Sequence, residues 1–137
     1  MSSSGRSTRP VLCLVLLVGC AGRPFESADP ACANQTPASF ARDVQPILRT
    51  HCAGIECHSA TFHLGSAYRN LVSVVASECH DGRLLVAPGS PSASYLLDKL
   101  EGSRLCFGER MPKGRAPLDD AAVATIRGWI CAGAIDD

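Results

Sequence analysis

Two cysteines followed at once by a histidine are the residues of this chain best suited to chemistry. They lie in the segment Cys52-Ala-Gly-Ile-Glu-Cys57-His58. Covalent attachment of a c-type haem needs this order, because each thiol adds to one vinyl group of the porphyrin and the following imidazole binds the iron. The usual spacing has two residues between the thiols, whereas this chain has four. We therefore expect Cys52 and Cys57 to hold one covalent haem, with His58 as proximal iron ligand and Gly54 helping the insertion to loop out.

Two alternatives use the same residues. One is a small disulfide between Cys52 and Cys57, with His58 an ordinary exposed side chain. The other is a structural zinc site formed by His51, Cys52, Cys57 and His58. That site would crowd all its ligands into one short stretch, with no second pair of ligands downstream. The order thiol, thiol, imidazole favours haem over both.

An iron bound by one histidine has either a sixth ligand or an open face, and this difference separates electron carriers from oxygen or peroxide chemistry. Met111 is the candidate distal ligand. It is the only methionine apart from the first residue, and its neighbours are polar or turn-forming rather than an apolar stripe. Pro112 restricts the residue before it and stiffens the loop. The alternatives are His51, His63 and His80, because a second imidazole would also close the iron site, at a lower potential.

The first twenty residues are typical of a bacterial lipoprotein leader. Two arginines precede an apolar run from Val11 to Val18, which is too short to span a bilayer as a helix. Leu17-Val18-Gly19-Cys20 resembles a lipobox. It predicts that residues 1–19 are a signal peptide and that Cys20 is lipidated. The alternative is a plain secretory signal with cleavage nearby and Cys20 free.

Either leader places the mature domain outside the cytoplasm. We expect it in the bacterial cell envelope, lipid-anchored and facing the periplasm or the cell surface. Ala21 after the lipidated cysteine is compatible with outer-membrane sorting, so we favour the outer over the inner membrane.

Removing 19 of the 137 residues leaves 118, and two of the 13 basic residues leave with the leader while all 13 acidic residues stay. The mature net charge is thus about −2, which gives nucleic acid no basic surface to bind. Residues 20–38 contain three prolines, several small residues and no apolar periodicity. Such a composition is typical of a tether, so we assign one small domain to residues 39–137.

A domain of this size benefits from cross-links. One of the eight cysteines leaves with the leader, one is lipidated and two hold haem, so four remain: Cys32, Cys79, Cys106 and Cys131. Three pairings of these four are possible. We favour Cys79–Cys106, which would join two halves of an irregular middle region, and Cys32–Cys131, which would tie the leading segment to the last helix. In the chain-entropy model each bridge contributes about 3 to 5 kcal/mol.

Apolar residues at helical spacing predict four helices, near residues 43–51, 66–72, 90–101 and 119–132. Asp43 is the expected N-cap of the first helix, Ser90 of the third, and Asp119 or Asp120 of the last. Gly102 is expected to end the third helix, and Gly133 lies just beyond the last. Residues 103–117 are rich in glycine and proline and should form the long loop that carries Met111. We therefore expect an all-α fold with long irregular connections.

These residues together resemble a known family: the segment from Phe40 to Ala134 is similar to the small cytochrome c-like domains of the planctomycete and myxobacterial type. The matching pieces are Phe40 with Asp43-Val44-Gln45-Pro46-Ile47-Leu48, the haem motif, Leu85-Val86-Ala87-Pro88-Gly89-Ser90-Pro91 with Ser94-Tyr95-Leu96 and Lys99-Leu100, then Met111-Pro112, and Trp129-Ile130 with Gly133-Ala134. The resemblance implies a cytochrome c-like fold of three to five helices around one haem, with His58 and Met111 on the iron. It also implies that the first and last helices cross, with Gly128 at the crossing. The insertion between the thiols and the extra cysteines depart from the family pattern.

The sequence thus predicts a membrane-anchored monohaem c-type cytochrome that transfers electrons between redox proteins of the cell envelope, and not an enzyme. The chain would be a monomer or a subunit of a redox complex. Two alternatives remain. One is a cofactor-free, disulfide-stapled envelope lipoprotein with a binding or structural role. The other is a haem enzyme or gas sensor with an open iron face.

Overall fold

The computed structural model describes residues 29–54, 57–58 and 66–137, and this part of the chain is helical. Its α-helices are α1 Gln45–His51, α2 Ala67–Leu71, α3 Tyr95–Glu101 and α4 Asp120–Cys131. Three shorter helical turns accompany them, η1 Pro30–Cys32, η2 Phe40–Val44 and η3 Pro91–Ala93. The described residues form isolated β-bridges but no sheet. The predicted all-helical class is therefore confirmed for them.

Several predictions fall on other residues. The leader 1–19, the lipidation site Cys20, residues 20–28 of the tether and the alternative ligand His63 lie outside the described part of the chain. Among the helices of the described residues, none combines the length and hydropathy needed to cross a bilayer.

The first helix begins earlier than predicted, at Phe40 instead of near Asp43. Its N-cap is Ser39, whose hydroxyl accepts a hydrogen bond from the Arg42 N–H at 3.3 Å. The Asp43 carboxylate reaches back and accepts from the Ser39 N–H at 2.9 Å. The prediction of Asp43 as N-cap was therefore wrong, because the N-cap is Ser39 and the Asp43 side chain bonds back to the backbone N–H of that residue. The turn η2 then continues directly into α1.

The predicted helix near residues 90–101 is two pieces, because Ser94 interrupts it. Ser94 is extended (φ −98°, ψ 108°) between η3 and α3. Its hydroxyl accepts from the Ala87 N–H at 2.9 Å and donates to the Ser90 carbonyl at 2.9 Å. A serine that bonds to backbone in this way competes with helical hydrogen bonding. Ser90 makes no side-chain capping bond, whereas Gly102 does end α3 in the left-handed conformation at φ 74°.

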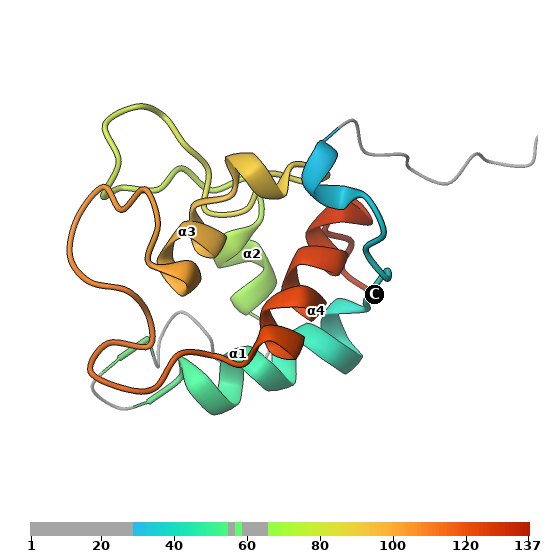
Figure 1. Cartoon of the computed structure of the whole chain (residues 1–137), viewed down its shortest axis with the longest axis horizontal. Coiled ribbons are helices and arrows are strands. Elements are labelled where there is room, and N and C mark those ends of the chain that lie inside the picture. The colour runs from blue at the N-terminus through green and yellow to red at the C-terminus, as the bar shows by residue number, and fades with distance from the viewer. Residues whose placement is uncertain (1–28, 55–56, 59–65) are drawn as a thin grey trace, which may run out of the picture.

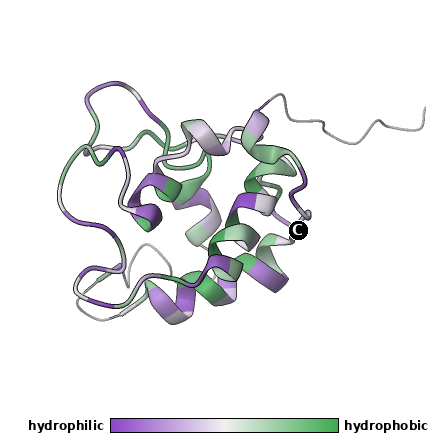
Figure 2. Cartoon of the chain, in the orientation of Figure 1, coloured by the Kyte–Doolittle hydropathy of each residue, from purple (hydrophilic) through white to green (hydrophobic). Residues whose placement is uncertain are grey.

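The last helix has the predicted start. The Asp119 carboxylate accepts from the Ala122 N–H at 2.7 Å and caps α4, which ends at Cys131. Its buried face includes Ile126, Trp129 and Ile130. In Figure 2, α1 and α4 each carry both hydrophobic and hydrophilic residues, as amphipathic helices do.

Helix α4 packs against the leading segment of the domain, which runs from η1 to η2, residues 30–44 (Figure 1). The centroids of the Trp129 and Phe40 rings lie 5.1 Å apart, and the Tyr68 ring from α2 makes an edge contact with Phe40 at a centroid distance of 5.4 Å.

The disulfide Cys32–Cys131 joins α4 to the leading segment, and Cys79–Cys106 joins two middle loops. These are the two pairs favoured from the sequence. The longer one spans 99 residues, for which the chain-entropy model gives on the order of 4–5 kcal/mol.

Gly128 provides a test of this packing. A Cβ atom placed there would stand 2.0 Å from the Thr36 carbonyl oxygen, so the close approach is to residue 36 and not to α1 itself. We expect Gly128→Ala to lower the free energy of unfolding by about 1–3 kcal/mol, the usual range for overpacking. In an unobstructed helix the same change raises stability by about 0.5–1 kcal/mol, so the sign is diagnostic. Urea unfolding followed by circular dichroism measures it.

Ala124→Gly is the matched control, because Ala124 is exposed on the same helix. It should cost about 1 kcal/mol through helix propensity alone. A Gly128→Ala protein as stable as the wild type would contradict the described packing.

Candidate functional site

A partly open cavity of about 270 Å³ brings together three of the four candidate haem residues, and Cys57 is not among the residues that line it. Its wall includes Cys52, His58 and Met111, which come from separate parts of the chain. Most of the remaining wall is apolar: Leu71, Ala76, Leu85, Leu96 and Leu100. The polar remainder is Ser77, Glu78, Tyr95 and Lys99. An apolar cavity with a few convergent polar groups is the usual form of a ligand site, although this volume lies just below the common range of about 300–1,000 Å³.

Helix α1 places the first thiol at the cavity. It ends at His51, and Cys52 follows at once, its N–H still bonded to the Leu48 carbonyl at 2.9 Å. The chain then turns back, because the His58 N–H donates to the Cys52 carbonyl at 3.2 Å. The Cys57 N–H donates to Gly54 at 2.9 Å. Gly54 is not among the positive-φ glycines, and its expected part in looping out the insertion stays a prediction.

The two thiols differ in environment. Neither is in a disulfide, and Cys52 is buried whereas Cys57 is exposed. Burial, with a smaller contribution from the neighbouring Cys57, raises the pKa of the Cys52 thiol to about 11, because an apolar surrounding disfavours the thiolate. Cys52 is therefore a neutral thiol at pH 7. The alternative of a Cys52–Cys57 disulfide is not found.

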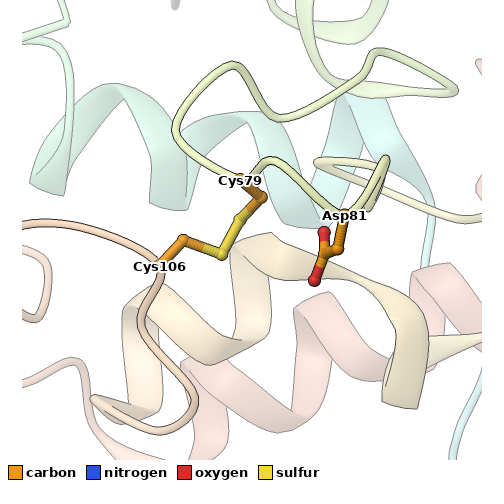
Figure 3. Close-up of side chains that lie close together, drawn as sticks. All are labelled: Cys79, Asp81 and Cys106. Carbon is orange, nitrogen blue, oxygen red and sulfur yellow. A yellow bond between two sulfur atoms is a disulfide. The ribbon is translucent and has the colours of Figure 1, made fainter.

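The described geometry does not favour the zinc alternative. His51, Cys52, Cys57 and His58 are all described, and they do not gather as a group of metal-ligating side chains. The group that does gather in the described residues is Cys79, Asp81 and Cys106, with its ligand atoms within 4.8 Å (Figure 3). Its two sulfurs are bonded to each other, so neither can act as a thiolate ligand. The Asp81 carboxylate is paired with Arg83 at 2.8 Å.

Met111 reaches the cavity from the loop between α3 and α4. It is partly buried, and its N–H donates to the Lys99 carbonyl at 2.7 Å. The alternative ligands His51 and His80 are exposed and do not line the cavity. Among the described candidates for the distal ligand, only Met111 therefore faces the same space as His58.

A polar network on the cavity wall was not foreseen from the sequence. The Lys99 ammonium lies 2.9 Å from the Glu78 carboxylate, and the Tyr95 hydroxyl donates to the same carboxylate at 3.2 Å. The Lys99 hydrogen bond holds the pKa of Glu78 below its ordinary value. The available signal was the spacing of Tyr95 and Lys99, four residues apart and hence on one helix face.

The thiol environments lead to a prediction for protein made without haem-attachment machinery. In the native state an alkylating reagent should modify Cys57 first, because Cys52 is buried and protonated. The rate at Cys52 should rise about tenfold per pH unit between pH 7 and 10, since only the thiolate reacts and its fraction grows tenfold per unit below the pKa. Peptide mapping by mass spectrometry follows both sites. In denaturant the two thiols should react alike; equal rates in the native protein would contradict the burial of Cys52.

Comparison with known proteins assigns no family. No protein-family model matches the chain, and neither a curated protein nor a solved structure matches it. The case for a function therefore depends on the cavity and on the residues that line it.

Proposed function

We propose that this protein is a monohaem c-type cytochrome that carries electrons in the bacterial cell envelope. One observation supports the proposal above all others: a single apolar cavity is lined by Cys52, His58 and Met111. The four other described cysteines are consumed in two disulfides, while Cys52 and Cys57 stay reduced. The sulfurs are thus divided as covalent haem attachment requires.

The donor set fits haem c. Thioether formation needs two reduced thiols, and imidazole with thioether is a known axial pair for iron. The leucines of the cavity suit the apolar faces of a porphyrin. A porphyrin is larger than the cavity, and Cys57, which would hold it together with Cys52, is exposed and is not among the residues that line the cavity.

The residues would then have distinct roles. When bound, the haem would supply an iron that cycles between ferrous and ferric states. Cys52 and Cys57 would hold the porphyrin, and His58 and Met111 would bind the iron. The leucines of the wall would exclude water, and a thioether ligand gives a higher potential than a second imidazole. With both axial positions filled, no substrate would be transformed.

The site of action belongs to the same proposal. A lipid on Cys20 would hold the domain at a membrane surface, with the part of the predicted tether before residue 29 as the link, because Cys32 is joined to α4 by a disulfide. Its partners would then be other redox proteins of the envelope, reached by diffusion along that surface. Nucleic acid is no part of this function, because the mature chain is slightly acidic.

A cofactor-free, disulfide-stapled lipoprotein is the second candidate, and the two disulfides of the structure lean slightly toward it. What it does not account for is a reduced Cys52 that lines an apolar cavity together with His58 and Met111.

The proposal predicts haem that survives denaturation. Full-length protein expressed with haem-attachment machinery should give a pyridine haemochrome spectrum and an intact mass greater by one haem. The double variant Cys52→Ala, Cys57→Ala should lose both signals. His51→Ala is the matched control, because His51 adjoins Cys52 but is exposed and does not line the cavity. A wild-type product with no Soret band and no added mass would refute the proposal.

A second prediction concerns the distal ligand. Met111→Ala should open one face of the iron, so the reduced protein should bind carbon monoxide readily, whereas wild type should resist it. The reduction potential should fall, because a thioether favours the ferrous state. His80→Ala should leave both measurements unchanged, since His80 does not line the cavity. If wild type and Met111→Ala bind carbon monoxide equally, Met111 is not the ligand and the open-iron alternative gains.

A further inference from the structure

The loop that carries Met111 needs an anchor. Residues 103–117 contain no helix and no bridge, and Figure 1 shows the connection from α3 to α4 as a long excursion from the helices. The disulfide at Cys106 ties the loop at one point, and elsewhere it is held by its side-chain and backbone contacts with its surroundings. Those contacts decide how firmly Met111 stays at the cavity.

Lys99 makes two of these contacts at once. Its carbonyl accepts from the Met111 N–H at 2.7 Å, and its ammonium donates to the Phe107 carbonyl at 2.7 Å. The two bonds hold the loop on both sides of the segment between residues 107 and 111. The Phe107 side chain itself is 73% exposed, so it contributes little packing to hold the loop.

The Lys99 ammonium is held in turn by groups beneath it. Its side chain is 11% exposed and forms an ion pair with Glu78 at 2.9 Å. It also lies 5.6 Å from the centre of the Tyr95 ring, within the range of a cation–π contact. A charge this buried is tolerated because it is paired and hydrogen-bonded, and the same partners fix its position.

Tyr95 adds a second link to the loop. Its hydroxyl accepts from the Cys106 N–H at 3.1 Å and donates to Glu78 at 3.2 Å. The residue is 1% exposed, so the ring is immobilised by packing. Tyr95 and Lys99, on one face of α3, therefore form hydrogen bonds with the loop at residues 106, 107 and 111.

We propose that Lys99, supported by the Tyr95 hydroxyl, is the positioning residue that holds Met111 at the cavity. For the iron, this inference rests on the proposed function, whereas the anchoring of the loop does not. Because the ammonium carries the Phe107 contact, removing it should release the loop while the rest of the fold remains.

Hydrogen exchange tests the anchoring on the full purified protein, whether or not it holds haem. Lys99→Met keeps the length and apolar stem of the side chain but removes the ammonium. Exchange at the Met111 amide should become at least about tenfold faster, which corresponds to about 1.4 kcal/mol, the scale of one charged hydrogen bond. Amides of α4 report global stability and should change far less. Lys113→Met is the matched control, because Lys113 is exposed in the same loop and makes only a 3.9 Å ion pair with Glu109.

Two further variants keep the test decisive. Lys99→Arg retains the charge and should restore part of the protection at Met111. Tyr95→Phe keeps the buried ring and removes only the hydroxyl, so exchange at the Cys106 amide should accelerate even if Lys99→Met fails to fold. Equal exchange at Met111 in Lys99→Met and Lys113→Met, or an unchanged Cys106 amide in Tyr95→Phe, would overturn the proposal.

In haem-loaded protein, Lys99→Met should lower the reduction potential and admit carbon monoxide, as Met111→Ala does, while Lys113→Met should do neither. A potential that stays at the wild-type value despite faster exchange would show that the loop does not position an iron ligand. The two failures are distinguishable. Absence of covalent haem refutes the proposed function and leaves the exchange result to decide the anchoring, whereas slow exchange in Lys99→Met refutes the anchoring alone.

Discussion

The packing of α4 against the leading segment is the constraint on which the rest of the structure depends. The contact is tight, since Gly128 leaves no room for a Cβ atom beside the Thr36 carbonyl, and Trp129 lies against Phe40. The disulfide Cys32–Cys131 closes the same contact covalently. Because Phe40 begins the helical segment that runs through α1 to Cys52, this packing also fixes where the first thiol enters the cavity. Long-range burial and one cross-link thus define a site formed by irregular connections.

Local patterns predicted what local interactions decide. The apolar face of α4, its Asp119 cap and the stop at Gly102 follow from short-range rules, and the structure has all three. The wrong predictions concern residues whose side chains form hydrogen bonds with the backbone that the sequence pattern did not indicate. Asp43 bonds back to Ser39, and Ser94 bonds to Ala87, so one helix starts earlier and another is broken. In both cases the side chain had several possible hydrogen-bond partners nearby, and the sequence does not indicate which one it bonds to.

The sequence predicted the proposed haem-binding residues of the candidate site, but it did not predict the residues that hold them in place. Cys52, His58 and Met111 could be chosen by residue type, and the structure places them around one cavity. The supports depend on tertiary contacts: Lys99 meets Glu78 across 21 positions, and the 1% exposed carboxylate of Asp98 receives both Arg83 and Arg104 at 2.7 Å. From sequence alone, a charged residue next to an apolar stripe is expected to be a solvated side chain. Only the fold shows that these charges are paired, and that Asp98 and Lys99 among them are buried.

The seclusion of the Cys52 sulfur has a consequence for oxidative folding. In an oxidising compartment any ionised sulfur can attack a disulfide, and the rate follows its ionised fraction and its accessibility. Once α1 has packed, Cys52 is nearly inert to such exchange, because it is sheltered and titrates near pH 11. Exchange of Cys52 with the disulfides Cys32–Cys131 and Cys79–Cys106 is thereby suppressed in the folded chain. This protection extends to Cys52 alone, because the other reduced thiol, Cys57, is exposed.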